Sequence, residues 1–295
     1  MPSEYHQYRR RFSSIDLCNK ANSKSNRPAI MGILNVTPDS FSDGGLYIDT
    51  EAAVAQALVM AEQGADIIDV GGESTRPGSV RVPAAVQCQR VLNIIERLRA
   101  ELPTLARISI DTTLSDVAEP ALRAGARIVN DISAGREDPA IFGLAREYDA
   151  DLVLMHMQGI PGNMQDNPRY NDVVAEVSAF LRERAQAAET AGVPHENIIL
   201  DPGIGFGKTR EHNLSLIACL KEFTALDYRI LLGASRKRFM GSLLNILTPA
   251  ELVPATCATT ALGVMTGIRI FRVHDVAANR QAADVAWAIK KSASH

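Results

Sequence analysis

Eight short apolar segments of this sequence each end in polar or charged side chains. The segments read AIMGIL, DIIDV, RISID, RIVND, DLVLMH, NIILD, RILLGAS and IRIFRVH. The side chains at their ends are Asn35, Asp69 with Glu73, Asp111, Asn130 with Asp131, His156, Asp201, Ser235 with Lys237, and Arg272 with His274. Asp111 and Asp201 are carboxylates, which accept paired N–H groups, and the amide of Asn130 both donates and accepts. These three groups complement the edge of an aminopyrimidinone ring.

Cationic side chains stand beside glycines or hydroxyls in other segments. In DVGGESTRPGS, Thr75 and Arg76 follow two glycines, which suits an anion or a carboxylate; a turn with an exposed arginine is the alternative. In GASRKRFMG, Lys237 lies in a basic run at an expected helix start, where the helix N-terminus also favours anions; a solvated basic helix face is the alternative. Alternation along the last apolar segment directs Arg272 and His274 to the same side.

The segment LDPGIGFGKTREHN is rich in glycine but lacks the spacing of a nucleotide-binding loop. Pro202 stands where GxxxxGK[ST] requires a glycine, which argues against an ATPase, and the dinucleotide fingerprint is also missing. What remains is a loop that presents Phe206 and Lys208 beside Asp201, a combination that suits a flat heteroaromatic ligand. We interpret His156 as a packed histidine at the edge of the core, because no His, Asp or Glu cluster has zinc spacing.

A repeated strand-and-helix unit has to position these side chains. From Ala29 onward, the apolar segments alternate with longer Ala-, Leu- and Glu-rich stretches of helical period. A helix-ending glycine precedes several of the segments, as in QGADIID, AGARIVN and TGIRIFR. Apolar strands separated by helices indicate a parallel sheet covered on both faces, and eight units favour a (β/α)8 TIM barrel over an open doubly wound sheet. The C-terminal strand ends would then surround one pocket.

Composition narrows the classes of partner. The 295 residues are 46% hydrophobic and 22% charged, enough for one barrel or two smaller domains. The formal net charge of −3 gives no electrostatic reason to expect a nucleic-acid or membrane partner, which leaves small molecules. No apolar run approaches the ~20 residues of a membrane span. The four cysteines, Cys18, Cys88, Cys219 and Cys257, are scattered without a CxxC pair, so we expect a reducing, cytoplasmic location.

The first 28 residues differ from the rest of the chain. They are polar, carry more basic than acidic side chains and lack the apolar stretch of a secretory signal. We therefore predict a polar, partly disordered or irregular N-terminal extension over residues 1–28, and one catalytic barrel domain over residues 29–295. Recruitment by an acidic surface is an alternative role for the extension.

Eight motifs, taken in order, resemble those of the dihydropteroate synthase family, folate-pathway enzymes that are the target of sulfonamides. The motifs are NVTPDSFSDGG, GGESTRPGS, SIDT, NDISAG, MHMQG, DPGIGFGK, SRK and RVHDV. The resemblance runs from about Ala29 to Val276 and covers all eight units. It implies a pterin-binding barrel, a homodimer, Mg²⁺ as cofactor, and a transferase reaction. In that reaction p-aminobenzoate condenses with 6-hydroxymethyl-7,8-dihydropterin pyrophosphate to give 7,8-dihydropteroate and pyrophosphate.

The resemblance also implies roles for individual residues. The pterin would be held by Asp111, Asn130, Met155, Asp201, Gly233 and Lys237. The Mg²⁺ would lie at Asn35, and the catalytic anion site would comprise Asn35, Asp43, Arg76, Arg272 and His274. The p-aminobenzoate would bind Phe41, Thr75, Pro77, Phe206, Lys237 and Arg238. The loop with Phe41 and Asp43 would close over the leaving group together with the Thr75–Arg76 loop.

Departures from the family pattern and two rival functions remain to be weighed. Arg238 stands where the family has a serine, and Ile160 where threonine is common, which bears on inhibitor affinity. No inserted aromatic stands beside Phe206, which favours a sulfonamide-sensitive form.

A pterin-binding methyltransferase that serves a corrinoid protein would share the pterin pocket but has no use for the anion site. A non-catalytic pterin-binding paralogue is disfavoured by the intact catalytic loops.

Overall fold

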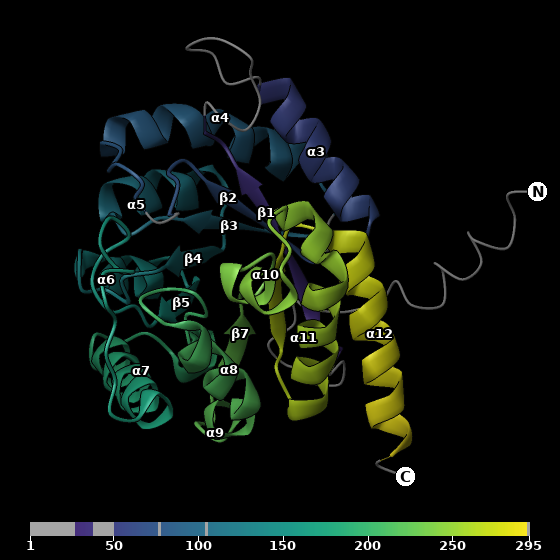
Figure 1. The fold of residues 1–295 in the computed structure, drawn as a ribbon. Coiled ribbons are helices and arrows are strands. Elements are labelled where there is room, and N and C mark those ends of the chain that lie inside the picture. The colour runs from purple at the N-terminus through teal and green to yellow at the C-terminus, as the bar shows by residue number, and fades with distance from the viewer. Residues whose placement is uncertain (1–26, 38–49, 76–77, 104–105, 294–295) are drawn as a thin grey trace, which may run out of the picture.

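The expected barrel is the observed architecture. The structure is a computed structural model that describes residues 27–37, 50–75, 78–103 and 106–293. Parallel strands pair in chain order and close into a barrel, with β1 hydrogen-bonded to both β2 and β8 (Figure 1). The strands are β1 (Ala29–Asn35), β2 (Ile67–Gly71), β3 (Arg107–Asp111), β4 (Ile128–Asp131), β5 (Asp151–Met155), β6 (Ile198–Asp201), β7 (Arg229–Leu232) and β8 (Ile270–Val273). The (β/α)8 prediction is therefore confirmed.

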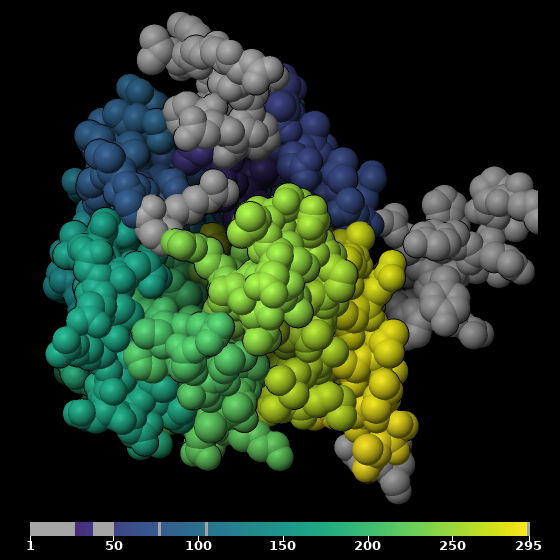
Figure 2. All heavy atoms as spheres, in the orientation of Figure 1, coloured from purple at the N-terminus to yellow at the C-terminus, as the bar shows by residue number. Residues whose placement is uncertain are grey.

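Helices surround the barrel and cover the outer face of the strands. They are α3 (Thr50–Glu62), α4 (Ala84–Glu101), α5 (Ser115–Ala124), α6 (Ala140–Glu147), α7 (Val173–Thr190), α8 (Arg210–Ala218), α9 (Leu220–Thr224), α10 (Arg238–Leu244), α11 (Val253–Thr266) and α12 (Val276–Ser292), with the 3-10 turns η1 (His195–Asn197) and η2 (Pro249–Leu252). Gly125 and Gly267 end α5 and α11 with φ of 137° and 106°, as the glycines before those strands predict. Figure 2 shows α10, α11 and α12 as one continuous surface.

Strand alternation divides the barrel interior into layers. Eight buried apolar side chains form one cluster inside the barrel: Ala29, Met31, Ile67, Ile128, Val153, Ile199, Leu231 and Ile270. The next inward-facing residue lies two positions further along each strand, because successive side chains point to opposite faces. From five of these strands that step leads to Asp69, Asn130, Met155, Asp201 and Arg272. Alternation along the strands thus places four polar side chains and Met155 next to the apolar cluster, on its C-terminal side.

An ion cluster closes the opposite, N-terminal end of the barrel. Asp151, at the start of β5, accepts from Arg107 at 2.5 Å and from Arg229 at 2.8 Å. These arginines begin β3 and β7, so three strand starts share one carboxylate. The side chains at this end are therefore bound to one another, and the reactive ring lies at the other end.

The end of the N-terminal extension that the structure describes is attached to the last helix. Arg27 forms an ion pair with Asp284 of α12, and Arg280 donates to the carbonyl of Pro28. Residues 1–26 lie outside the described residues, so the disorder and the domain boundary expected there stay predictions. Among helices in the described ranges, none has the length and apolar character needed to cross a membrane.

Candidate active site

An arginine held between two carboxylates lies at the centre of the strand-end ring. Arg272 of β8 donates from Nε to Asp69 at 2.7 Å and from Nη2 to Asp111 at 2.6 Å. Burial opposes the charge of the guanidinium, but the two carboxylates outweigh it and raise the pKa of Arg272, so it stays cationic. Burial raises the pKa of Asp111 to about 7, although Arg272 lowers it. The protonation state of Asp111 therefore depends on what pairs with Arg272.

Asp69 is a site residue to which the sequence analysis assigned no role. Its side chain is fully buried, and its Oδ2 accepts from both Arg272 and the Asn130 amide, the latter at 3.1 Å. Its Oδ1 is buried without a hydrogen-bond partner among the described residues. Its inward position, two residues after Ile67, was the signal that could have identified it. Asp69 orients two side chains that the resemblance assigns to ligand binding.

A carboxylate, an ammonium group and an aromatic ring meet beside this cluster. Asp201 accepts from the Gly203 N–H at 2.7 Å, and burial raises its pKa to about 6 despite that bond. The Lys237 Nζ lies 4.1 Å from the centroid of the Phe206 ring, a cation–π contact. Burial lowers the pKa of Lys237 to about 8, and Arg272 adds to the effect. These groups offer a hydrogen-bonding edge and a flat stacking surface.

Two further predicted pterin residues complete this pocket. Met155 is buried in a small apolar cluster of Ile132, Met157 and Met164, against which Phe206 packs. Gly233 follows β7, and a Cβ placed on it would lie 3.6 Å from Oδ2 of Asp201, so glycine leaves that carboxylate accessible. The methionine side chains give the pocket an adaptable apolar surface, and Asp201 gives it a charged hydrogen-bonding group. A flat heteroaromatic ligand requires both.

Asn35 and Asp111 border one small space across Gly71. A Cβ on Gly71 would lie 3.7 Å from Oδ1 of Asn35 and 3.7 Å from Oδ2 of Asp111. A Cβ on Gly72 would instead come within 3.2 Å of Gln87 in α4. Gly72 therefore permits close packing of α4, and the approach of a ligand to Gly71 stays a prediction.

His274 is held as a neutral hydrogen-bond donor. Its Nδ1 lies 3.0 Å from the Ser235 hydroxyl, which also accepts from the backbone N–H of His274 at 3.2 Å. In the tautomer in which the Ser235 hydroxyl donates to Nδ1, the ring proton lies on Nε2. Burial lowers the pKa of His274 to about 4, with a further contribution from Arg272. The imidazole offers an N–H to an anion without carrying charge.

The basic run near α10 divides into side chains with different environments. Arg236 forms a double hydrogen bond with Asp275, at 2.9 and 2.6 Å, and adopts a φ of 56°. Arg238 is exposed and makes no ion pair within the part of the chain that the structure describes. Of this run, only Lys237 lies in the pocket, and contact of Arg238 with p-aminobenzoate stays a prediction.

Lys208 is turned away from the pocket, contrary to the expectation that its loop presents it to a ligand. Its Nζ is 2.9 Å from Nδ1 of His156 and donates to the Phe206 carbonyl at 2.9 Å. Burial lowers the pKa of Lys208 to about 7 and that of His156 to about 2. His156 also packs edge-on against Phe180, with centroids 4.9 Å apart. The interpretation of His156 as a packed histidine is confirmed.

Several predicted residues are not placed by the geometry above. Thr75 is half-buried at the last described position before a gap. Phe41, Asp43, Arg76 and Pro77 lie outside the described residues. Their roles in closing the site and in binding p-aminobenzoate stay predictions.

Comparisons with known proteins agree with this geometry. Residues 31–274 match the family described as pterin binding enzyme. A dihydropteroate synthase of Synechocystis is 45% identical over 263 residues, covering 89% of this chain and 90% of the relative. A Yersinia pestis dihydropteroate synthase structure with a sulfonamide drug complex has a TM-score of 0.84 at 38% identity, covering 90% of this chain and 95% of that one.

A second solved structure adds a substrate. The dihydropteroate synthase of Xanthomonas albilineans with 4-aminobenzoic acid has a TM-score of 0.83 at 45% identity, over 90% of this chain and 93% of that one. The comparisons of sequence and of fold thus agree with one another. The chain therefore belongs to the pterin binding enzyme family and, within it, to the dihydropteroate synthases.

Proposed function

We propose that this chain condenses 6-hydroxymethyl-7,8-dihydropterin pyrophosphate with p-aminobenzoate to give 7,8-dihydropteroate and pyrophosphate. The observation that carries the proposal is Arg272, a buried cation that lies directly beside a pocket with the acceptors of a pterin edge. The relatives named above support the same reaction, since one structure contains 4-aminobenzoic acid and another a sulfonamide drug. Small molecules are accordingly the proposed partners.

The chemistry divides between the two halves of the site. Asp201, Asp111 and Asn130 orient the pterin, whose electron-rich ring stabilises a cation at the adjacent carbon. The C–O bond breaks and both electrons leave with the pyrophosphate. The lone pair of the arylamine then forms the C–N bond, and the amine loses a proton. The main task of the protein is to neutralise the departing charge and exclude water.

Arg272 and His274 have donors suited to the departing charge. Nε and Nη2 of Arg272 bind carboxylates, whereas its Nη1 makes no hydrogen bond within the described ranges. The Nε2–H of His274, fixed by Ser235, provides a second donor. Two preoriented N–H groups in a largely buried site bind an oxyanion without reorganising at the moment of reaction.

The residues present fit a Mg²⁺ ion that binds together with the pyrophosphate. The described residues contain no group of three or more His, Cys, Asp or Glu side chains placed to hold a metal. Mg²⁺ bound through substrate phosphates needs only one or two protein oxygens, because water fills its other positions. Asn35 Oδ1 would hold it, with the Asp111 carboxylate nearby. When bound, the ion would supply positive charge to the leaving group.

The p-aminobenzoate half of the site is assigned more from the resemblance than from contacts. Thr75, Phe206 and Lys237 would line its slot, and Phe41, Pro77 and Arg238 would complete it. Asp43 and Arg76 would belong to the two loops that close over the leaving group. A sulfonamide would compete for the same slot. The cytoplasmic location expected from the scattered cysteines is part of the same proposal.

A pyrophosphate-release assay tests the function. The protein is mixed with the pterin pyrophosphate and Mg²⁺, with and without p-aminobenzoate, and release is followed with time. We expect release that depends on p-aminobenzoate and is suppressed by chelating Mg²⁺. Pterin binding without release would support the non-catalytic paralogue instead. Methyl transfer from a methyl-tetrahydrofolate to a corrinoid would support the rival methyltransferase.

The affinity for pterin should rise with pH between 5 and 7. Ring N–H groups require carboxylate acceptors, and burial raises the pKa of Asp201 to about 6 and that of Asp111 to about 7. At pH 5 both groups hold a proton and lose acceptor capacity, so binding weakens by about tenfold from Asp201 alone. Calorimetric titration with a neutral pterin over this range measures the effect. A constant Kd would show that the carboxyls are not the acceptors.

A homodimer through α11 and α12 is part of the proposal. These helices lie side by side (Figure 1), and both carry exposed apolar side chains. Leu262 and Met265 on α11 are 45% and 44% exposed, and Val285 and Ile289 on α12 are 61% and 55% exposed. Contiguous exposed apolar side chains are typical of protein–protein interfaces. A second copy of the chain would cover them.

Charged substitutions at this surface should separate the dimer. The double change Val285→Glu and Ile289→Glu buries two carboxylates at the proposed interface, so we expect a monomer in light scattering after size exclusion. The matched control is Leu247→Glu, because Leu247 is 98% exposed and lies between α10 and η2. The control should remain dimeric. A monomeric wild-type protein at micromolar concentration would contradict the assignment.

A further inference from the structure

The connection between β6 and α8 lies directly against the connection that follows β5. Gly203 has a φ of 68°, and a Cβ placed on it would clash with the carbonyl oxygen of His156. Gly207 has a φ of 59°, and a Cβ there would clash with the carbonyl oxygen of Gln158. Glycine is required at both positions, because a side chain would push the two connections apart. The path of residues 203–207 is therefore set by the connection after β5.

Three successive carbonyl groups of this loop accept hydrogen bonds from side chains. The carbonyls of residues 205, 206 and 207 accept in turn from Gln165 at 2.8 Å, Lys208 at 2.9 Å and the Tyr170 hydroxyl at 2.8 Å. Gln165 and Tyr170 belong to the β5–α7 connection. Lys208 is joined to the same connection, because its Nζ also lies 2.9 Å from Nδ1 of His156. The loop is thus bound to the β5–α7 connection at three points.

Lys208 is the most deeply buried of these three donors. The side chain is 3% exposed, so little water competes for its hydrogen bonds. In its ammonium form Lys208 has an acceptor for each N–H group, namely the Phe206 carbonyl, Nδ1 of His156 and the His156 carbonyl at 3.3 Å. Burial lowers the pKa of His156 to about 2, so the imidazole is neutral and its Nδ1 can accept. Lys208 and His156 therefore fix the backbone of Phe206 to the end of β5.

The other side of the loop faces Lys237. A Cβ on Gly205 would lie 2.9 Å from Cδ of Lys237, and the Lys237 Nζ lies 4.1 Å from the centroid of the Phe206 ring. The resemblance assigns both Phe206 and Lys237 to the p-aminobenzoate slot. A shift of the loop would change the separation of these two side chains.

We propose that Lys208 and His156 are positioning residues that hold the Phe206 ring against Lys237 and thereby set the width of the p-aminobenzoate slot. The proposal rests on the function proposed above. Both residues act through the loop, since the N–H groups of Lys208 are used by His156 and by the loop itself. The buried pair, which the reaction does not require for its chemistry, thus has a role in substrate binding.

The kinetic test measures the KM for p-aminobenzoate at saturating pterin pyrophosphate. Lys208→Met removes the three donors, and His156→Phe removes Nδ1 but keeps a ring against Phe180. In each variant we expect this KM to rise about tenfold, the scale of one hydrogen bond to a charged group. The kcat should stay near the wild-type value, because the donors to the departing charge lie at the end of β8. The double variant should match Lys208→Met, because the two residues share one contact.

The contact between Phe206 and Lys237 can also be followed without substrate. The ring current of an aromatic side chain shields protons above its face, so the Hε resonances of Lys237 should lie upfield of those of the exposed Lys221. In Lys208→Met we expect the Lys237 resonances to move downfield, towards those of Lys221. NMR with lysine-selective ¹³C labelling measures this shift, and loss of the signal in Lys237→Arg assigns it.

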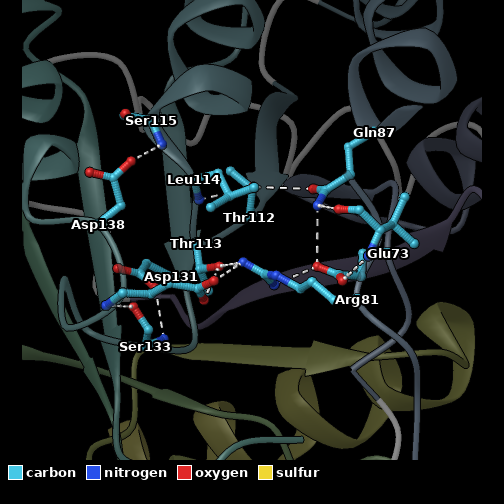
Figure 3. Close-up of polar contacts among 12 residues, drawn as sticks. Glu73, Arg81, Gln87, Thr112, Thr113, Leu114, Ser115, Asp131, Ser133 and Asp138 are labelled. Carbon is cyan, nitrogen blue, oxygen red and sulfur yellow. Dashed lines mark hydrogen bonds and ion pairs between the residues drawn. The ribbon is translucent and has the colours of Figure 1, made fainter. Parts of the chain in front are cut away.

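Asp138→Ala is the matched control. The Asp138 carboxylate accepts from the backbone N–H of Ser115 at 2.7 Å and so joins the β4–α6 connection to the start of α5 (Figure 3). Its loss breaks the same kind of link between other strands, so the KM and the Lys237 resonances should stay unchanged.

Three results would overturn the positioning role. They are wild-type KM values in both Lys208→Met and His156→Phe, additive increases in the double variant, and unmoved Lys237 resonances in Lys208→Met. An inactive wild-type protein would instead refute the proposed function. The Lys237 resonances would then still decide whether Lys208 positions Phe206.

Discussion

Replacing Arg272 with alanine is expected to lower kcat by about 10²-fold or more, the usual loss for one preoriented donor to a developing oxyanion. The side chain is the only cation paired with Asp69 and Asp111 among the described residues, and its Nη1 is available to the pyrophosphate. Its removal leaves two buried carboxylates unpaired, which costs about 3–5 kcal/mol unless one takes up a proton. Steady-state pyrophosphate release, with thermal unfolding measured in parallel, separates the two effects.

Two companion variants make this result specific. Arg272→Lys keeps the positive charge, but an ammonium group lacks the planar guanidinium that bonds both carboxylates and a ligand at once. The kcat of this variant should therefore lie between those of Arg272→Ala and the wild type. Arg269→Ala removes an arginine three residues earlier, at the opposite end of the barrel, where burial and Arg229 lower the pKa of the guanidinium. It should retain wild-type turnover. A folded Arg272→Ala variant with wild-type kcat would exclude Arg272 from the chemistry.

Asp201→Asn should weaken pterin binding by about two orders of magnitude, as expected when a charged acceptor of ring N–H groups is lost in a buried site. The amide retains an oxygen for the Gly203 N–H, which Asp201 now bonds at 2.7 Å. Its NH₂ group then faces the donors of the pterin, and the buried donor is left unpaired. Calorimetry with the pterin alone measures this loss without any contribution from turnover.

The control for this substitution is Asp227→Asn. Asp227 is exposed and has a φ of 66°, a conformation that asparagine adopts readily, so affinity should not change. The Asp201→Asn variant should also lose the pH dependence of binding near pH 6. Unchanged pterin affinity in Asp201→Asn would remove this residue from the pocket.

The sequence predicts the barrel and the inward ring well, because both depend on short-range periodicity. Several strands supply a polar residue two positions after a buried apolar one, as in Ile67 and Asp69 or Ile199 and Asp201. Successive side chains of a strand point to opposite faces, so the sequence of one strand shows which residues face inward. In a parallel barrel each strand pairs with the strands next to it in chain order, so its neighbours are also known. These two facts were enough to bring distant residues to one rim.

The pairing of those polar groups was not predictable in the same way. Lys208 binds His156, although its loop was expected to present it to a ligand, and Arg236 of the basic run binds Asp275. A spacing pattern shows on which side of a strand a residue lies. It does not show which neighbouring side chain forms a hydrogen bond or an ion pair with that residue. Asp69 was placed in the ring but given no role for the same reason, since its two partners come from β4 and β8. Individual ligand roles came from the family motifs.

The apolar cluster of the barrel and the Asp151 cluster beneath it have a kinetic consequence. Both fill the interior from the N-terminal end, so a ligand reaches the strand-end ring from the C-terminal end of the barrel. Under the proposed function, a pterin bound at this ring would have to arrive before the p-aminobenzoate that would bind above it. The coupled product would then leave from the same end of the barrel, and a compound bound in the outer position would trap the pterin beneath it.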